Sequence, residues 1–265
     1  MDDNFNKNQD QMNQNYHTYN SDNGNYQNYG YSDAYGNSYQ SSQSALDLEA
    51  KVQGVISKTF LFMFMVLLVT AASAYMTYST GVGLNLLRNG MMTPILVAEV
   101  AVVLLANATL RRNNAILSSI MLFVYSVVNG ITLSTVFYVY EITSIISIFV
   151  IAAVVFGCMA TYGLVTKKDL TALGTIGMMG LVGVIVLGIV NIFLHSNTLG
   201  LGIAAVGLAI FIGLTAYDLQ KLKNIARSNI GMSETSLALY GALVLYLDFI
   251  NIFLQLLRLF GRARD

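Results

Sequence analysis

Residues 237–259 read LALYGALVLYLDFINIFLQLLRL, an apolar run with one acidic residue, Asp248, at its midpoint. At 1.5 Å per residue, a helix of this length crosses the roughly 30 Å of hydrocarbon in a bilayer. An ionisable side chain inside such a helix is costly and usually functional. The run therefore predicts a membrane-spanning helix that carries Asp248 deep inside a helix bundle.

Six other apolar runs of similar length precede this one. They cover about residues 59–79, 91–110, 115–139, 143–165, 171–194 and 199–218. Spanning segments of this kind must be helices, because backbone amides find no other hydrogen-bond partners in lipid. Only 11% of the residues are charged and 55% are hydrophobic, whereas roughly a quarter of a soluble domain is charged. The sequence predicts an all-α integral membrane protein with seven transmembrane helices.

The first 44 residues have a different composition, rich in Asn, Gln, Ser, Gly and Tyr. Such a segment cannot bury enough apolar area to offset the entropy lost on ordering, so residues 1–44 are predicted to form a disordered tail. The tail is either a solvated extension or a site for contact with a partner. Residues 45–58, ALDLEAKVQGVISK, predict a short amphipathic helix that leads into the transmembrane domain, residues 45–265.

Lys and Arg residues are distributed unevenly between the apolar runs, which predicts the orientation in the membrane. Alternate gaps on the N-terminal side carry nine, namely Lys51, Lys58, Arg111, Arg112, Lys167, Lys168, Lys221, Lys223 and Arg227. The opposite side carries four, namely Arg88, Arg258, Arg262 and Arg264. We therefore expect a cytoplasmic N-terminus and, with seven crossings, a C-terminus outside. A re-entrant last segment would instead place the three terminal arginines inside.

Residue types that build common catalytic and metal sites are scarce. Cys158 is the only cysteine, and His17 and His195 are the only histidines. An intrachain disulfide or a thiolate cluster is therefore excluded, and a catalytic triad would have at most one imidazole in the folded part. The formal net charge is zero, which gives no support for nucleic-acid binding. We expect neither an enzyme nor a cofactor.

Three acidic residues lie within the predicted spans: Glu99, Asp218 and Asp248. Asn251 and Gln255 follow Asp248 at i+3 and i+7, so all three share one helix face. A polar stripe of this kind favours a bundle interior or a water-filled pathway. The alternative for each aspartate is a structural role, in which the carboxyl group only locks helix packing.

Asp218 lies near the cytoplasmic end of its run, yet the chain can bring it close to Asp248. The turn signal Ser228-Asn229-Ile230-Gly231 separates the two residues. A helical hairpin folded there places the two carboxyl groups at depths that differ by roughly 6 Å. Two carboxyl groups held together in a poorly hydrated site cannot both ionise easily. Such a pair can share a proton, bind a hard cation or pair with a basic residue.

Arg111 and Arg112 end the second predicted span on the cytoplasmic side. This is the level at which Asp218 is expected to emerge. These arginines either anchor the topology, or one of them forms a salt bridge to an aspartate and closes a cytoplasmic gate.

Several of these stretches resemble the transmembrane Bax inhibitor-1 motif family. Residues 239–258, LYGALVLYLDFINIFLQLLR, resemble its terminal signature, and residues 217–220, YDLQ, resemble its other aspartate motif. Residues 130–133 and 99–112 are also similar. The resemblance covers about residues 50–262 and leaves the polar tail outside.

The resemblance implies a seven-helix bundle with the last helix at its centre, in the bacterial cell membrane. It also implies a pH-sensitive calcium leak channel, in which Asp218 and Asp248 form the proton-sensing pair and bind Ca²⁺. A basic residue, here Arg111 or Arg112, would hold the first aspartate in the closed state. Other members are implied to modulate a membrane-bound protease or to suppress cell death, so a regulatory interaction protein is the alternative. A proton-coupled transporter is third, because no matching pair of broken helices supports it.

Overall fold

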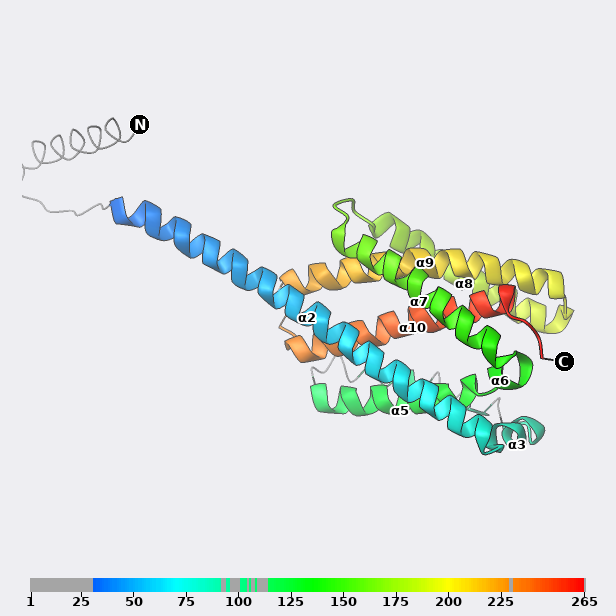
Figure 1. Ribbon diagram of the computed structural model, residues 1–265. Coiled ribbons are helices and arrows are strands. Elements are labelled where there is room, and N and C mark those ends of the chain that lie inside the picture. The colour runs from blue at the N-terminus through cyan, green and yellow to red at the C-terminus, as the bar shows by residue number, and fades with distance from the viewer. Residues whose placement is uncertain are drawn as a thin grey trace, which may run out of the picture. The chain divides into compact units, whose positions relative to one another are not determined.

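The computed structural model describes residues 31–91, 94–95, 101–103, 105, 108, 114–228 and 231–264. Within these residues every regular element is an α-helix, as Figure 1 shows. The β-type pairing in this part of the chain is limited to one isolated bridge between Tyr140 and Ala263. The predicted all-α class is confirmed.

The described helices follow the apolar pattern of the sequence. In chain order they are α2 (Tyr31–Ser79), α3 (Val82–Arg88), α5 (Ala115–Leu133), α6 (Val136–Val139), α7 (Ile142–Val165), α8 (Thr171–Leu194), α9 (Asn197–Ser228) and α10 (Glu234–Phe260). Six stretches are long and apolar enough to cross a membrane: Gln43–Ser79 in α2, Ala115–Val139 across α5 and α6, and α7 to α10. They match six of the seven predicted spans. The remaining span, residues 91–110, lies largely outside the described residues, so the count of seven stays a prediction.

Helix α2 differs from the prediction at its start. The predicted lead-in helix, residues 45–58, is helical but continues without a break into the first span. Its Ala, Leu, Glu and Lys residues are strong helix formers, and no proline interrupts them. Residues 31–44, which belong to the predicted disordered tail, form the first turns of α2, and residues 1–30 of the tail lie outside the described residues. The chain divides into two units, Met1–Leu46 and Asp47–Asp265, and the packing described below belongs to the second.

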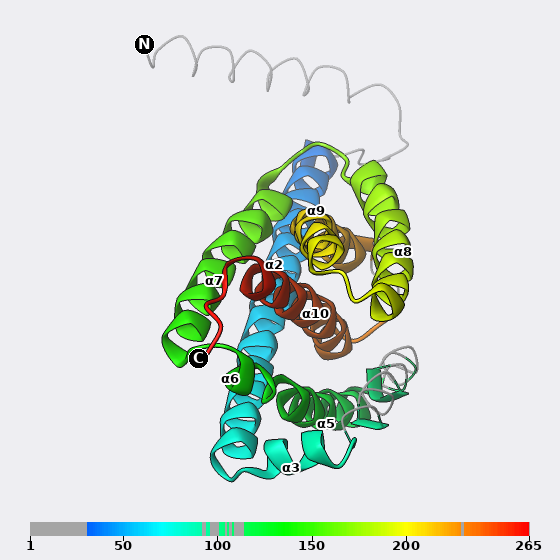
Figure 2. The ribbon, with the colours of Figure 1, turned by 90° about the vertical axis from the view of Figure 1, so that its right-hand side faces the viewer.

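Helix α10 lies at the centre of the bundle. In the apolar stretch of α10, 72% of the residues are buried, which is the largest share among the six candidate spans. In that of α8, the share is 6%. Figure 2 shows α10 with α2, α5, α7 and α9 around it. The Ser233 side chain caps the start of α10 by accepting a hydrogen bond from Ser236 N at 3.1 Å. This arrangement agrees with the central last helix that the family resemblance implies.

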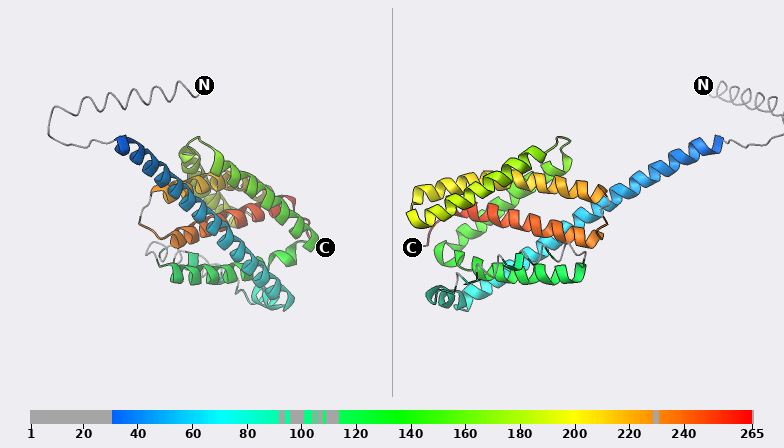
Figure 3. Two further views of the ribbon diagram at one scale, coloured as in Figure 1. Left: turned by 60° about the vertical axis from the view of Figure 1, so that its left-hand side comes forward. Right: turned by 180° about the vertical axis from the view of Figure 1, so that it is seen from behind.

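Helices α9 and α10 form the helical hairpin predicted from the turn signal. Helix α9 ends at Ser228 and α10 begins at Glu234, and the two helices lie side by side in Figure 3. Gly231 lies between them with a φ of 75°, a left-handed conformation that favours glycine because it has no Cβ. The hairpin sets the relative depth of Asp218 and Asp248.

Candidate functional site at the α9–α10 hairpin

Asp248 is buried on the central helix, with 4% of its surface exposed. Its Oδ2 atom is buried and has no hydrogen-bond partner among the described residues. A buried polar atom left without a partner costs about 1–3 kcal/mol, and such an atom in a native structure calls for an explanation. The structure therefore places a carboxyl group that packing alone does not account for at the predicted position.

Asp218 is half-buried on α9 and lines a small cavity on the α10 side of that helix. The other lining residues are Lys221 and Leu222 from α9, and Tyr240, Gly241, Val244 and Leu245 from α10. The Asp218 carboxylate is close enough to Asp248 for the two like charges to repel each other, and Lys221 attracts it from the same helix. Both carboxyl groups lie in the described part of the chain, and no hydrogen bond joins them. The hairpin thus brings them into electrostatic range.

Gly241 permits the close packing of the helices around this cavity. A Cβ atom at this position would lie 2.5 Å from Leu222 Cδ2 of α9 and 3.0 Å from Thr59 Cγ2 of α2. Both separations are far shorter than an ordinary contact between carbon atoms. The absence of a side chain at Gly241 therefore allows α10 to approach both neighbouring helices near Asp218.

A buried cluster of uncharged polar groups lies on another face of α10, and the sequence did not point to it. Tyr246 Oη donates a hydrogen bond to Asn129 Oδ1 of α5 at 3.0 Å. It also lies 2.8 Å from Thr70 Oγ1 of α2, and because the Tyr246 proton is used at Asn129, Thr70 is the donor in that contact. The Ser126 carbonyl of α5, 3.1 Å from Thr70 Oγ1, competes for the same Thr70 proton. All four residues are buried, so this cluster ties three helices together through Tyr246.

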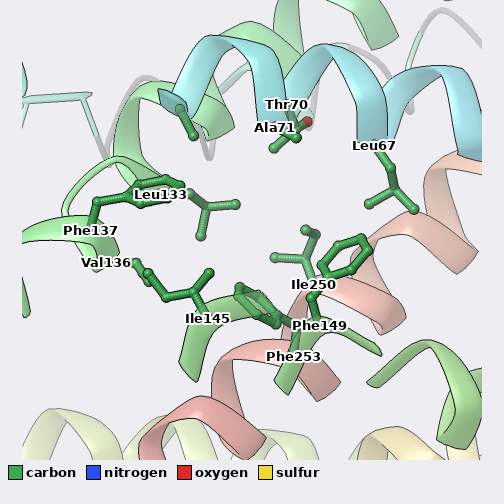
Figure 4. A pocket seen from close by; sticks show the side chains of 11 residues that line it. Leu67, Thr70, Ala71, Leu133, Val136, Phe137, Ile145, Phe149, Ile250 and Phe253 are labelled. Carbon is green, nitrogen blue, oxygen red and sulfur yellow. The ribbon is translucent and has the colours of Figure 1, made fainter. Parts of the chain in front are cut away.

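A separate cavity of about 90 Å³ lies between α2, α5, α6, α7 and α10 (Figure 4). Its lining residues are Leu67, Thr70, Ala71, Ala74, Leu133, Val136, Phe137, Ile145, Phe149, Ile250 and Phe253. Among these side chains, Thr70 alone carries an oxygen atom. Hard cations require several oxygen ligands, so this apolar space cannot hold one. The two candidate acidic residues, Asp218 and Asp248, lie on α9 and α10 instead.

This chain is similar to known proteins over most of its length. The chain matches the sequence model of the family described as "Inhibitor of apoptosis-promoting Bax1" over residues 52–265. The chain belongs to the Bax inhibitor-1 family. The E. coli (strain K12) "Inner membrane protein YbhL" is 36% identical over 228 residues, covering 84% of this chain and 97% of the relative. An uncharacterized protein of Deinococcus radiodurans is 37% identical over 224 residues, covering 84% and 95%. The predicted family and the integral membrane character are confirmed.

Both aspartates lie inside the region that matches the Bax inhibitor-1 family, whereas residues 1–51 lie outside it. Glu99, Arg111 and Arg112 are outside the described residues, so the predicted gating latch stays a prediction. No group of three or more His, Cys, Asp or Glu residues that could hold a metal ion occurs in the described part of the chain. Calcium takes about six to eight oxygen ligands, so Asp218 and Asp248 could supply only part of such a set.

The two other polar residues of the predicted stripe on α10 are half-buried. Asn251 Nδ2 donates to the Leu247 carbonyl of its own helix at 2.8 Å. The Gln255 amide packs against α9, where Nε2 would lie 3.3 Å from a Cβ atom at Gly207. Neither side chain supplies the missing partner of Asp248 Oδ2. Their supporting role in this Bax inhibitor-1 family member therefore stays a prediction.

Proposed function

We propose that this Bax inhibitor-1 family member is a pH-sensitive calcium leak channel of the bacterial cell membrane. In this proposal, Asp218 and Asp248 together sense protons and bind the cation. The observation that carries it is the buried Asp248 carboxyl group, whose Oδ2 has no described partner on the central helix. Asp218, across the hairpin and within electrostatic range, supports the same conclusion.

Like-charge repulsion supplies the driving force for gating. Two carboxylates several ångströms apart inside a protein repel each other by an energy on the order of a few kcal/mol. A proton or a divalent cation relieves this repulsion, so the pair responds to both. We expect protonation to break the contact between Asp218 and Arg111 or Arg112, which lets the second span or α10 move and changes the calcium flux.

The test is a calcium flux assay on purified protein in liposomes that contain a calcium indicator. We expect the flux to change between about pH 6 and pH 8, because a carboxyl group that leaves water becomes harder to ionise. Asp248→Asn is expected to remove most of this pH dependence. Asp169→Asn makes the same chemical change at an exposed residue between α7 and α8, so it serves as the matched control and should behave like the wild type. The mechanism is wrong if Asp248→Asn leaks Ca²⁺ with an unchanged pH dependence.

The alternative is a regulatory interaction protein that modulates a membrane protease or a stress pathway. It is favoured by one observation: residues 1–51, including the polar tail, lie outside the family match, so a contact made by the tail would be particular to this chain. Deletion of residues 1–44 distinguishes the two functions. Loss of the cellular phenotype with intact calcium flux would favour the interaction protein, whereas parallel loss of both would favour the channel.

A further inference from the structure

A polar cavity of about 490 Å³ lies where the α7–α8 loop meets the end of α9. Its lining residues are Val165, Thr166, Lys167, Lys168, Asp169, Gln220, Lys223, Asn224 and Arg227. We call the four basic residues among them, Lys167, Lys168, Lys223 and Arg227, the loop cluster. Four positive charges face one negative charge, that of Asp169, so the lining has an excess of three. This imbalance favours an anionic ligand.

Two of the four cations remain available for such a ligand. Lys223 Nζ already donates to the Leu164 carbonyl at 2.7 Å, and Arg227 pairs with Glu49 at 2.5 Å. Lys167 and Lys168 are exposed, and neither forms an ion pair with a described residue. The positive charges of Lys167 and Lys168 are therefore not neutralised by the described residues.

The Asp169 carboxyl group forms hydrogen bonds with Thr171 at the start of α8. Its Oδ1 accepts hydrogen bonds from Thr171 N at 2.9 Å and from Thr171 Oγ1 at 2.6 Å. The bond from the Thr171 side chain has the larger effect, and together the two bonds lower the pKa of the Asp169 carboxyl group below its usual value. The ionised group lies just before the start of α8, where the helix dipole favours a negative charge.

The backbone of the loop is held in place against α9, so the cavity has a defined shape. Gln220 Oε1 accepts a hydrogen bond from Leu170 N at 2.9 Å, and Gln220 Nε2 donates to the Lys168 carbonyl at 2.8 Å. One side chain thus binds both a donor and an acceptor of the loop. The hydrogen bond from Gln220 to the Lys168 carbonyl fixes the backbone at Lys168. The Lys168 ammonium group is not used in this contact and can bind a ligand.

The loop lies at a membrane surface. The apolar span in α7 ends at Val165 and that in α8 begins at Thr171, so residues 166–170 lie where hydrocarbon gives way to lipid headgroups. Val165, at the edge of the cavity, is 73% exposed and can contact an acyl chain. Basic pockets between transmembrane helices at this depth are suited to anionic lipid headgroups.

We propose that the loop cluster binds the phosphate-bearing headgroup of an anionic phospholipid. Lys167 and Lys168 contact the phosphate, and Val165 packs against the first part of the acyl chain. The competing explanation is that these lysines only orient the protein in the membrane, which requires no preference for one bound lipid. The inference does not depend on the proposed ion flux, because the site is built from a different loop and carries a different charge.

The test is native mass spectrometry of the full-length protein, purified in detergent and titrated with phosphatidylglycerol or phosphatidylcholine. The wild type is expected to retain phosphatidylglycerol preferentially. Loss of two lysines near the surface weakens this binding on the order of thirtyfold, since each contributes about fivefold. The test variant is Lys167→Gln with Lys168→Gln. Replacement of both by arginine keeps the charge and should retain the lipid.

The matched control is Arg88→Gln with Arg262→Gln, which removes two exposed charges, one at the last residue of α3 and one just after α10. It should leave phosphatidylglycerol binding unchanged. An equal loss in the control, or no loss in the lysine variant with an unchanged circular dichroism spectrum, would overturn the proposal. Inorganic phosphate is titrated in parallel. If it displaces the lipid at equal concentration, the site binds a free anion and the lipid assignment is wrong.

Discussion

The Tyr246 hydroxyl group contributes to the stability of the bundle, because it connects α10 to α2 and α5. The Tyr246→Phe substitution removes a single oxygen atom, which donates to Asn129 at 3.0 Å and lies 2.8 Å from Thr70 Oγ1. The aromatic ring stays in place, where it packs edge to face with Tyr125 at a centroid distance of 5.8 Å. The cost therefore comes from hydrogen bonding and not from a cavity.

The expected magnitude follows from the two contacts. Hydrogen bonds between transmembrane helices contribute on average about 0.6 kcal/mol and at most about 1.7 kcal/mol each. Tyr246 is fully buried, so water cannot readily replace its hydroxyl group. We expect Tyr246→Phe to lower the free energy of unfolding by about 1–3 kcal/mol.

The measurement is reversible unfolding in mixed detergent micelles, followed by circular dichroism. Tyr75→Phe is the matched control, because Tyr75 is 59% exposed and surface changes usually cost no more than about 0.5 kcal/mol. Thr70→Val completes a double-mutant cycle. Since Thr70 and Tyr246 share a contact, their effects should fail to add by at least about 0.5 kcal/mol. A Tyr246→Phe effect as small as that of the control would refute the reasoning.

Three further substitutions test the packing around α9. Gly241→Ala places a methyl group 2.5 Å from Leu222 Cδ2 and should destabilise the bundle by about 1–3 kcal/mol. Gly202→Ala has no neighbour within 4 Å and should be neutral or stabilising by up to about 1 kcal/mol; equal unfolding midpoints for the two variants would contradict this account. Gln220→Ala removes both bonds that hold the α7–α8 loop, so trypsin should cleave after Lys168 faster than in the wild type. An unchanged cleavage rate would show that the loop is held by other contacts.

Much of the fold could be predicted because hydropathy alone determines which segments leave water. The six described spans lie where the apolar runs predicted them, and the turn signal at Gly231 correctly located the α9–α10 hairpin. The deep position of Asp248 followed from the length of its run. The continuity of α2 was missed, although the good helix formers and the lack of a stop signal between its amphipathic and apolar segments favour one continuous helix.

The Tyr246 cluster escaped prediction for a different reason. Uncharged polar residues such as Thr70 and Asn129 occur in many transmembrane helices, and their cost depends on whether a partner faces them. Which faces meet is decided by tertiary packing, which the spacing within one helix does not contain. A usable signal existed, since Tyr246 lies two residues before Asp248 on a helix already expected to be central. Searching the other apolar runs for uncharged polar residues at a similar depth would have supplied its candidate partners.

The central position of α10 has a consequence for how the protein is made. Helix α10 comes after the surrounding helices in the chain, so those helices enter the membrane before α10 does. Until α10 arrives, Thr59 and Thr70 lack the Ala238 carbonyl and the Tyr246 hydroxyl that they contact in the finished bundle. Insertion of the hairpin therefore closes the structure in one late step. A chain interrupted before Glu234 would leave both threonines without these partners from α10.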